Sequence, residues 1–322
     1  MRAIVQTRPG SVDTLQWTEI ERPTPGAGQL LVKIAAAGVN RADIVQREGR
    51  YPAPPGASPL LGLEVAGEVA AVGEGADGFE VGEAVFGLVA GGGYAEYAVL
   101  EAACAVKRPD WLGVEQAASL PEAWMTAWLN LVQLGCLASG ETALIHAGSS
   151  GVGAAAIQLA GLLGAEALTT VGSAHKADFC RALGAVAAID YHHEDFSVVA
   201  KAHGGVDLVL DCIGGDYLEG NLLSLKPDGR LVVIGLMGGA RAELDLGRLL
   251  LKRLSVQGST LRPQPLPVKA GLTAALRDVV LPAIAAGRAK VTLDKVYPMA
   301  EVAQAHRYME ENRNLGKLVL CL

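Results

Sequence analysis

The chain has 322 residues, more than one hydrophobic core usually supports, so we expect two domains. Hydrophobic residues make up 51% of it and aromatic residues 5%, which is typical of packed helix and sheet layers and excludes a disordered chain. The formal net charge is −7 and no run of Lys or Arg occurs, so the composition does not support general binding of nucleic acid or of an anionic membrane.

Short alternating or β-branched runs, broken by glycine and proline, dominate the first part of the chain. They lie at 1–6, 29–35, 64–72, 84–89 and 94–99 and predict a mostly antiparallel β domain over residues 1–120. Residues 41–58 are rich in proline and carry charged side chains together with Tyr51. This segment is too polar for a core and too long for a simple turn, so we expect a loop that forms the wall of a site.

The pattern changes near residue 111 to helical spacing, with Leu120, Trp124, Trp128 and Leu131 recurring every three or four positions. Buried-strand runs separated by helix-length segments follow at 142–147, 165–171, 206–212 and 230–236, with a weaker one at 185–191. Alternating strands and helices predict a parallel, doubly wound α/β sheet, a Rossmann domain over residues 121–262.

The tail after Arg262 resumes with a helix at 269–287, a strand at 293–297, a helix at 300–311 and a strand at 317–322. We expect residues 263–322 to return to the first domain. The apolar stretch 150–171 is long enough to resemble a membrane helix, but it contains Gln158, Glu166 and several glycines. We interpret it as a helix followed by a strand.

A glycine-rich turn joins the strand predicted at 142–146 to the next helix. It reads Gly148-Ser149-Ser150-Gly151-Val152-Gly153, a spacing that departs from the strict G-x-G-x-x-G pattern. The context of strand, turn and helix nevertheless predicts a dinucleotide site, because glycines admit the pyrophosphate and the helix N-terminus meets its negative charge. The alternative is a tight turn without a ligand.

The second strand ends without the acidic residue that usually binds the ribose of NAD. Gly172, Ser173 and Lys176 follow it instead, and a cation there neutralises a 2′-phosphate, so NADPH is favoured over NADH. An ordinary solvated lysine is the alternative for Lys176. Tyr191 closes the third strand, where it either packs near the adenosine or is a rim aromatic.

Several motifs together resemble one known family. They are Gly38-Val39-Asn40-Arg41-Ala42-Asp43, Pro54-Pro55-Gly56, Leu61-Gly62-Leu63-Glu64, Pro121-Glu122-Ala123-Trp124-Met125-Thr126-Ala127, His146-Ala147-Gly148 and Asn314-Leu315-Gly316-Lys317. With these motifs the whole chain resembles the zinc-independent quinone oxidoreductase branch of the medium-chain dehydrogenase/reductases. The resemblance implies a GroES-like catalytic domain beside the Rossmann domain, with cofactor and acceptor held between them.

The same resemblance assigns roles to individual residues. The zinc alcohol dehydrogenases of the superfamily carry Cys where this chain has Asn40 and His where it has Leu63, so we expect no catalytic metal. Tyr51 and Asn40 are the candidate catalytic residues, and Tyr51 either donates a hydrogen bond to the acceptor or only packs on the cofactor. The implied nicotinamide contacts are Asn40, Tyr51, Thr126, Leu236, Met237 and Gly238, and Asn314 touches the cofactor from the tail.

Two further polar residues are interpreted from their surroundings. His146 ends a buried strand, where a hydrogen-bonded structural histidine is the favoured interpretation. Glu122 has no evident cationic partner in the sequence, and we expect it to cap or orient Asn40 or Arg41.

The leading functional hypothesis is an NADPH:quinone oxidoreductase, for which the resemblance suggests one-electron delivery. Alternatives are an NADPH-dependent enal or enoyl thioester reductase and a non-catalytic NADPH-binding protein with a structural or RNA-binding role. The family also implies a homodimer, formed through an edge strand near residues 254–259. We expect no nucleic acid or membrane partner.

The five cysteines lie far apart and form no C-x-x-C pair, which argues against a disulfide framework and a structural zinc site. The N-terminal residues lack the apolar core of a secretory signal. Both features fit a cytoplasmic protein.

Overall fold

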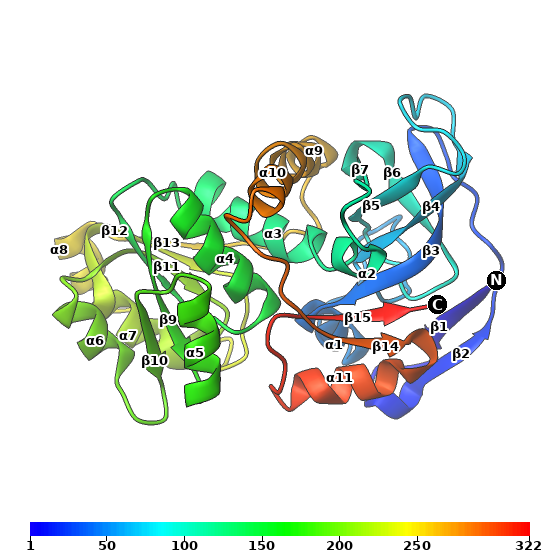
Figure 1. Ribbon diagram of the computed structural model, residues 1–322. Coiled ribbons are helices and arrows are strands. Elements are labelled where there is room, and N and C mark those ends of the chain that lie inside the picture. Colours follow the sequence, from blue (N-terminus) through cyan, green and yellow to red (C-terminus); the bar gives the residue numbers. More distant parts are fainter. The chain divides into compact units, whose positions relative to one another are not determined.

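The computed structural model describes all 322 residues, which form two compact units (Figure 1). Unit 1 comprises Met1–Met125, Arg262–Pro282 and Val291–Leu322, and unit 2 comprises Thr126–Leu261 and Ala283–Lys290. The sequence-based division assigns all of 263–322 to the first domain, whereas Ala283–Lys290 groups with unit 2. There the Gln158 amide receives a hydrogen bond from Lys290 N at 2.7 Å and donates one to Lys290 O at 3.2 Å.

Unit 1 is built on a mostly antiparallel sheet of order β14-β15-β3-β4-β5-β7, with β6 also paired to β3. The sheet strands are β3 (Gln29–Val39), β4 (Glu64–Val72), β5 (Ala84–Leu88), β6 (Tyr97–Glu101), β7 (Ala105–Lys107), β14 (Leu293–Pro298) and β15 (Lys317–Cys321). Strands β1 (Arg2–Gln6) and β2 (Leu15–Glu19) form a separate pair. Buried aliphatic residues such as Leu30, Val65 and Leu100 form the core, which confirms the predicted β domain.

The helices of unit 1 include one that the sequence interpretation missed. They are α1 (Arg41–Arg47), α2 (Val114–Ala117), α9 (Leu266–Ala275), α10 (Leu281–Ala285, which continues into unit 2) and α11 (Val302–Glu310). The loop expected over 41–58 is wrong for its first seven residues, which form α1. The helix begins where the Asp43 carboxylate accepts a hydrogen bond from Asn40 N at 2.8 Å, and its polar residues are buried because they are paired.

Unit 2 contains a fully parallel sheet of order β10-β9-β8-β11-β12-β13. The strands are β8 (Thr142–Ile145), β9 (Glu166–Val171), β10 (Ala187–Asp190), β11 (Val206–Asp211), β12 (Leu225–Val233) and β13 (Ser255–Gly258). The helices are α4 (Gly151–Leu162), α5 (Ala174–Ala182), α6 (Phe196–Ala202), α7 (Leu218–Ser224) and α8 (Leu246–Lys252). The predicted doubly wound sheet is confirmed. The strand order reverses at β8, and ligands bind at such a switch point in open α/β sheets.

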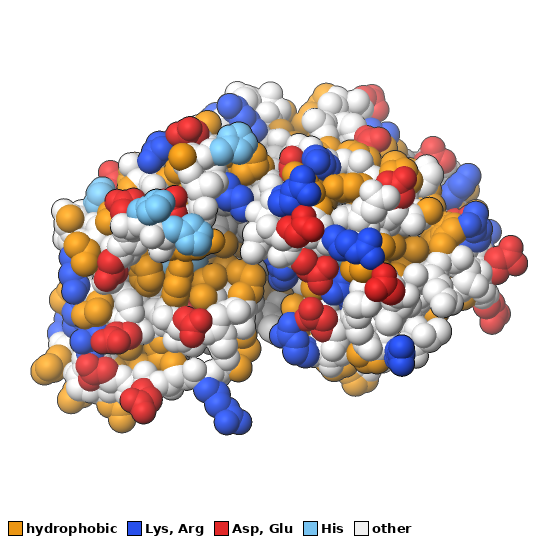
Figure 2. Space-filling view, turned by 90° about the horizontal axis from the view of Figure 1, so that it is seen from below, with side chains coloured by type: hydrophobic (Ala, Val, Ile, Leu, Met, Phe, Trp, Pro, Cys, Tyr) orange, Lys and Arg blue, Asp and Glu red, His pale blue; other side chains and the backbone are white.

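The remaining helix, α3 (Pro121–Trp128), begins in unit 1 and continues as a π-helical stretch over Leu129–Leu134 in unit 2. The apolar stretch 150–171 forms α4 and then β9, as interpreted from its sequence. None of the helices combines the length and the apolar character that crossing a bilayer requires. Figure 2 shows basic and acidic side chains interspersed over one face of the molecule, without a large area of either sign.

Candidate functional site

The glycine turn between β8 and α4 is closely packed. A Cβ atom at Gly148 would overlap the Thr169 hydroxyl, and one at Gly153 would lie 2.7 Å from the Cα of Gly148. Ser150 caps α4, because its hydroxyl accepts a hydrogen bond from Gly153 N at 3.0 Å. Gly151 and Val152 are half-buried, and their N–H groups have no acceptor within the protein. The turn therefore offers two backbone donors at the positive end of a helix, which suits a phosphate.

The ends of β9 and β10 lie side by side, since Val171 and Asp190 are register partners. Tyr191 is 44% exposed and its hydroxyl covers Gly172, where a Cβ atom would collide with it. The Ser173 hydroxyl accepts a hydrogen bond from Lys176 N at 3.4 Å, so Lys176 lies in the first turn of α5. Gly172, Ser173, Lys176 and Tyr191 thus share one edge of the sheet.

The ends of β11 and β12 form a joined pair of loops at the same edge. The Asp211 carboxylate accepts a hydrogen bond from Ile213 N at 2.7 Å, and Ile213 O accepts one from Gly238 N at 2.7 Å. Leu236 and Met237 are 53% and 50% exposed on the second loop. Thr126, the remaining predicted residue of unit 2, lies on α3 and accepts a hydrogen bond from Asn130 through its backbone oxygen.

His146 is buried and fully bonded. Its Nε2 atom lies 2.7 Å from Asn221 Oδ1 and its Nδ1 atom 3.0 Å from Thr170 Oγ1, while Phe196 and Tyr217 pack edge-on against the ring. Burial lowers the pKa of His146 to about 4, so the ring is neutral at pH 7. These contacts agree with the interpretation of a structural histidine.

Asn40 belongs to a buried polar cluster in unit 1. Its Nδ2 atom donates to Glu64 Oε1 at 2.8 Å, and Lys317 Nζ donates to both Asn40 Oδ1 and Glu64 Oε1 at 2.5 Å. Glu64 is fully buried and Lys317 is 3% exposed, so this ion pair is shielded from water. The pair holds the Asn40 amide in one orientation and leaves it one N–H for a further partner.

Glu122 lies beside this cluster in the first turn of α3. Its backbone N–H donates to Glu64 Oε2 at 2.9 Å, but its own carboxyl group has no hydrogen-bond partner and the residue is 9% exposed. Burial, together with the negative charge of Glu64, raises the pKa of Glu122 to about 8, so the carboxyl is protonated at pH 7. The expectation that Glu122 caps or orients Asn40 or Arg41 is wrong. The contact between α3 and β4 uses the backbone of Glu122, while Arg41 donates to Met309 O.

Tyr51 lies near a buried arginine that sequence reasoning missed. The Arg262 guanidinium carbon is 5.7 Å from the centre of the half-buried Tyr51 ring. Arg262 donates to Ala90 O and to Gln46 Oε1, both at 2.7 Å, and its Nη2 atom is buried without a partner. Burial raises the pKa of Tyr51, so its hydroxyl keeps its proton. No local pattern distinguishes Arg262 or Lys317 from surface cations.

Asn314, predicted to contact the cofactor, is buried in the turn before β15, where its amide donates to Gly316 O at 2.8 Å. Leu63, which stands where zinc enzymes have a histidine, is 1% exposed. No group of three or more His, Cys, Asp or Glu side chains is arranged to hold a metal ion.

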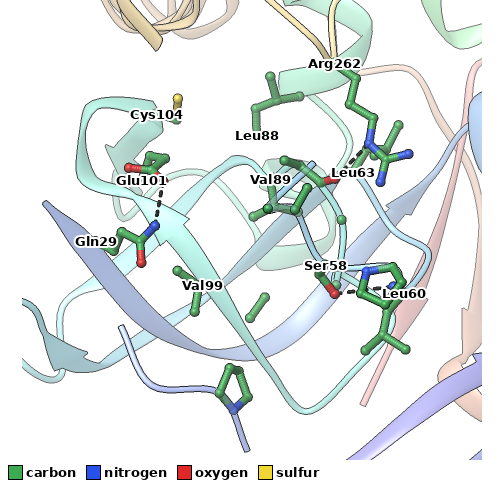
Figure 3. A pocket seen from close by; sticks show the side chains of 18 of the residues that line it. Gln29, Ser58, Leu60, Leu63, Leu88, Val89, Val99, Glu101, Cys104 and Arg262 are labelled. Atoms are coloured by element: carbon green, nitrogen blue, oxygen red, sulfur yellow. Dashed lines mark hydrogen bonds between the residues drawn. The ribbon is translucent and has the colours of Figure 1, made fainter. Parts of the chain in front are cut away.

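Unit 1 also contains a cavity of about 500 Å³ with mainly apolar walls (Figure 3). Its lining includes Leu60, Leu63, Leu88, Val89, Val99 and Cys104, together with the polar residues Glu122 and Arg262. A cavity of this size and character is typical of a small-molecule site.

Comparison with known proteins identifies two matching family models. Residues 26–110 match the alcohol dehydrogenase GroES-like domain, and residues 183–320 match a family described as zinc-binding dehydrogenase. Among curated relatives, a phenolphthiocerol/phthiocerol polyketide synthase subunit from Mycobacterium tuberculosis is 31% identical over 98% of this chain. The chain spans only 14% of the length of that relative.

Solved structures match over nearly their full length. A mycobacterial protein complexed with NADPH is 32% identical, with a TM-score of 0.89 and full coverage of both chains. A quinone oxidoreductase from Pseudomonas syringae is 32% identical, with a TM-score of 0.88 over 100% of this chain and 99% of the other. The CurK enoyl reductase is 30% identical, with a TM-score of 0.86 over 99% and 98%.

Proposed function

The chain belongs to the medium-chain dehydrogenase/reductase superfamily, and from this premise we propose that it is a zinc-free, NADPH-dependent reductase of quinones. The observation that carries the proposal is the glycine turn of unit 2, with its two unpaired N–H groups and a lysine in place of an acidic residue at the next strand end. Such a turn suits a phosphorylated dinucleotide.

The residues of unit 2 fit NADPH in chemical type. The turn of Gly148, Ser150, Gly151, Val152 and Gly153 would hold the pyrophosphate. The N–H groups of Gly151 and Val152 would donate to it, and the glycines would let it approach the backbone closely. Gly172, Ser173 and Lys176 would hold the 2′-phosphate, with Tyr191 beside the adenosine, and Thr126, Leu236, Met237 and Gly238 would line the nicotinamide end. In unit 1, Asn40, Tyr51 and Asn314 are the proposed contacts. When bound, NADPH supplies the reducing equivalents, and the chain binds and orients the acceptor.

Chemistry without zinc is supported by the Asn40 cluster. The Lys317 ammonium neutralises Glu64 at 2.5 Å and carries a positive charge where a metal would need ligands. Leu63 offers no ligand atom. A quinone is already electrophilic, so orientation and hydrogen bonding by groups such as the Tyr51 hydroxyl are sufficient to activate it.

Reduction of an enal or enoyl thioester is the second candidate. The similarity to an enoyl reductase favours it, as does the protonated Glu122, because reduction of an activated alkene requires a proton. The decisive experiment follows NADPH and NADH oxidation by the purified protein with ortho-quinones, para-quinones and enals. We expect the fastest turnover with NADPH and a quinone. Turnover with enals alone would replace the quinone proposal, and no turnover with any acceptor would exclude both.

We also propose that the protein is a homodimer formed through β13. This strand is the edge of the parallel sheet, and Val256 on it is 41% exposed. On α8, which precedes β13 in the chain and packs against β12, Leu246, Leu250 and Leu251 are 67%, 77% and 80% exposed. Light scattering should give the mass of a dimer, and Val256→Lys should shift it toward a monomer; a monomeric wild-type protein would contradict the proposal.

A further inference from the structure

The cavity of unit 1 has a distinct distribution of polar groups (Figure 3). Gln29 and Glu101 line it, but Gln29 Nε2 donates to Glu101 Oε1 at 2.7 Å, so they satisfy each other. Leu63, Leu88 and Val89 form an apolar wall near Arg262. The ionisable residues Glu21 and Lys269 also line the cavity, but Glu21 is exposed and Lys269 is half-buried, so water can reach them. Glu122 and Arg262 are the buried acidic and basic residues of the lining, and the protein does not meet their full hydrogen-bonding capacity.

Glu122 is the better placed of these two residues to meet a ligand. The Nη2 atom of Arg262 lacks a partner, but the surrounding protein covers it. The carboxyl oxygens of Glu122 also lack a partner, and they are not covered. Glu64 accepts no hydrogen bond from the carboxyl of Glu122: its Oε1 atom accepts from Asn40 and Lys317, and its Oε2 atom accepts from the backbone N–H of Glu122. The carboxyl group of Glu122 is therefore available to a ligand in the cavity, although the residue as a whole is nine-tenths buried.

We propose that this cavity receives the acceptor and that the carboxyl group of Glu122 donates a hydrogen bond to the acceptor's carbonyl oxygen. The inference rests on the reductase function proposed above. The acceptor class is a compact apolar carbonyl compound, whose body contacts the aliphatic wall while its oxygen meets Glu122. The nearby guanidinium of Arg262 favours any negative charge that develops on this oxygen during reduction.

The proposal predicts a pH dependence, because only a protonated carboxyl donates a hydrogen bond. The charged or titratable groups that act on Glu122 are Glu64 from β4, Lys317 from β15, Asp43 from α1, Arg262 and Tyr51. The pKa of Asp43 is raised to about 6 and that of Tyr51 is raised above its ordinary value of 10. Neither group titrates near pH 8, whereas Glu122, with a pKa of about 8, does.

The test measures equilibrium binding of 9,10-phenanthrenequinone by fluorescence or calorimetry between pH 7 and 9.5. NADPH is left out, so that no reduction occurs. The ring fusion of this quinone leaves no free quinone carbon for a thiol to attack. We expect wild-type affinity to fall about tenfold for each pH unit above 8. Glu122→Gln, which keeps a donor and cannot ionise, should bind within about twofold of wild type at pH 7 and lose the pH dependence. Glu122→Val should bind at least tenfold more weakly at pH 7.

Two further variants keep the proposal falsifiable if Glu122→Val does not fold. Val99→Phe fills part of the cavity from β6 and should weaken binding at every pH, whereas the surface variant Arg277→Met, from a residue 57% exposed, should change nothing. The proposal is overturned if wild type does not bind the quinone, if Glu122→Gln keeps the wild-type pH profile, or if Val99→Phe binds normally. Steady-state turnover is measured separately, so loss of the reductase function and loss of this binding site are distinguishable.

Discussion

The two units bury very different kinds of polar group. Unit 1 buries the ionisable side chains of Asp43, Arg47, Glu64, Glu122, Arg262 and Lys317, whereas Asp211 is the buried carboxylic acid of unit 2. Unit 2 relies instead on glycines and on backbone N–H groups at strand ends. A buried charge is stable only with its partner in place, whereas a backbone cradle depends on the absence of side chains. The two units should therefore fail under different substitutions.

The largest effect is expected from Lys317→Met in unit 1. It leaves the fully buried Glu64 carboxylate without its cation and should lower the free energy of unfolding by about 3–5 kcal/mol. The matched change in unit 2 is Lys226→Met, which breaks a pair with Asp207 at 2.8 Å that is partly exposed to solvent. It should cost about 1 kcal/mol or less. Urea denaturation measures the free energy of unfolding of both variants. Equal decreases in the two variants would show that the two units do not differ in this respect.

The second prediction concerns the one buried histidine of each unit, His306 in unit 1 and His146 in unit 2. Burial lowers their pKa values to about 3 and about 4, from an ordinary value of 6.5. A depressed pKa means that the stabilising contribution is complete above pH 6.5 and is lost as the pH falls toward the folded-state pKa. Each histidine should therefore reduce the free energy of unfolding by up to about 1.4 kcal/mol per pH unit between 6.5 and 4.

The variants His146→Asn and His306→Gln isolate these two contributions. Asp43 and Glu122 have raised pKa values, so they stabilise the folded state as the pH falls over part of this range. The pH dependence of the free energy of unfolding of wild type is therefore the sum of these opposing contributions. Each histidine variant should bind fewer protons on unfolding than wild type does. Its free energy of unfolding should therefore fall less steeply than that of wild type between pH 6.5 and 5. Unchanged slopes in both variants would show that neither histidine is held neutral.

Glycine substitutions in unit 2 are the third test. Gly148→Ala places a methyl group on the Thr169 hydroxyl and should lower the free energy of unfolding by about 1–3 kcal/mol, with weaker NADPH binding. Gly161→Ala, at an exposed position near the C-terminal end of α4, has open space around the added atom and should stabilise the protein by about 0.5–1 kcal/mol. Thermal unfolding measures the stability of both variants, and NADPH titration measures their affinity for the cofactor. A Gly148→Ala protein as stable as wild type would contradict the close packing.

The smallest expected effect is on cofactor choice. Lys176→Glu should weaken NADPH about tenfold more than NADH, because it places a negative charge beside the proposed 2′-phosphate position. Lys201→Glu changes an exposed lysine on α6 and serves as the control. Cofactor fluorescence measures all four affinities. Equal weakening of NADPH and NADH would show that Lys176 does not distinguish them.

Local patterns in the sequence were sufficient for most of the architecture. Residue periodicity and turn residues identified the strands β3, β4, β8, β9 and β11 to within a few positions, because alternation and apolar runs are properties of neighbouring residues. The same reasoning missed α1, whose buried Asp43 and Arg47 look like loop residues in the sequence. Their partners lie on distant segments, as in the contact between Asp43 and Tyr94.

The sequence by itself determined the two-domain α/β organisation, the glycine turn and the absence of an acidic residue after β9. Only the tertiary structure decided which charges are buried and paired. Glu64 and Lys317 are separated by 253 positions and meet because β15 and β4 both pair with β3. Glu122 is flanked by apolar residues in the sequence, and its raised pKa depends on a carboxylate from another strand. Such coupling depends on distances in space, which no pattern of neighbouring residues encodes.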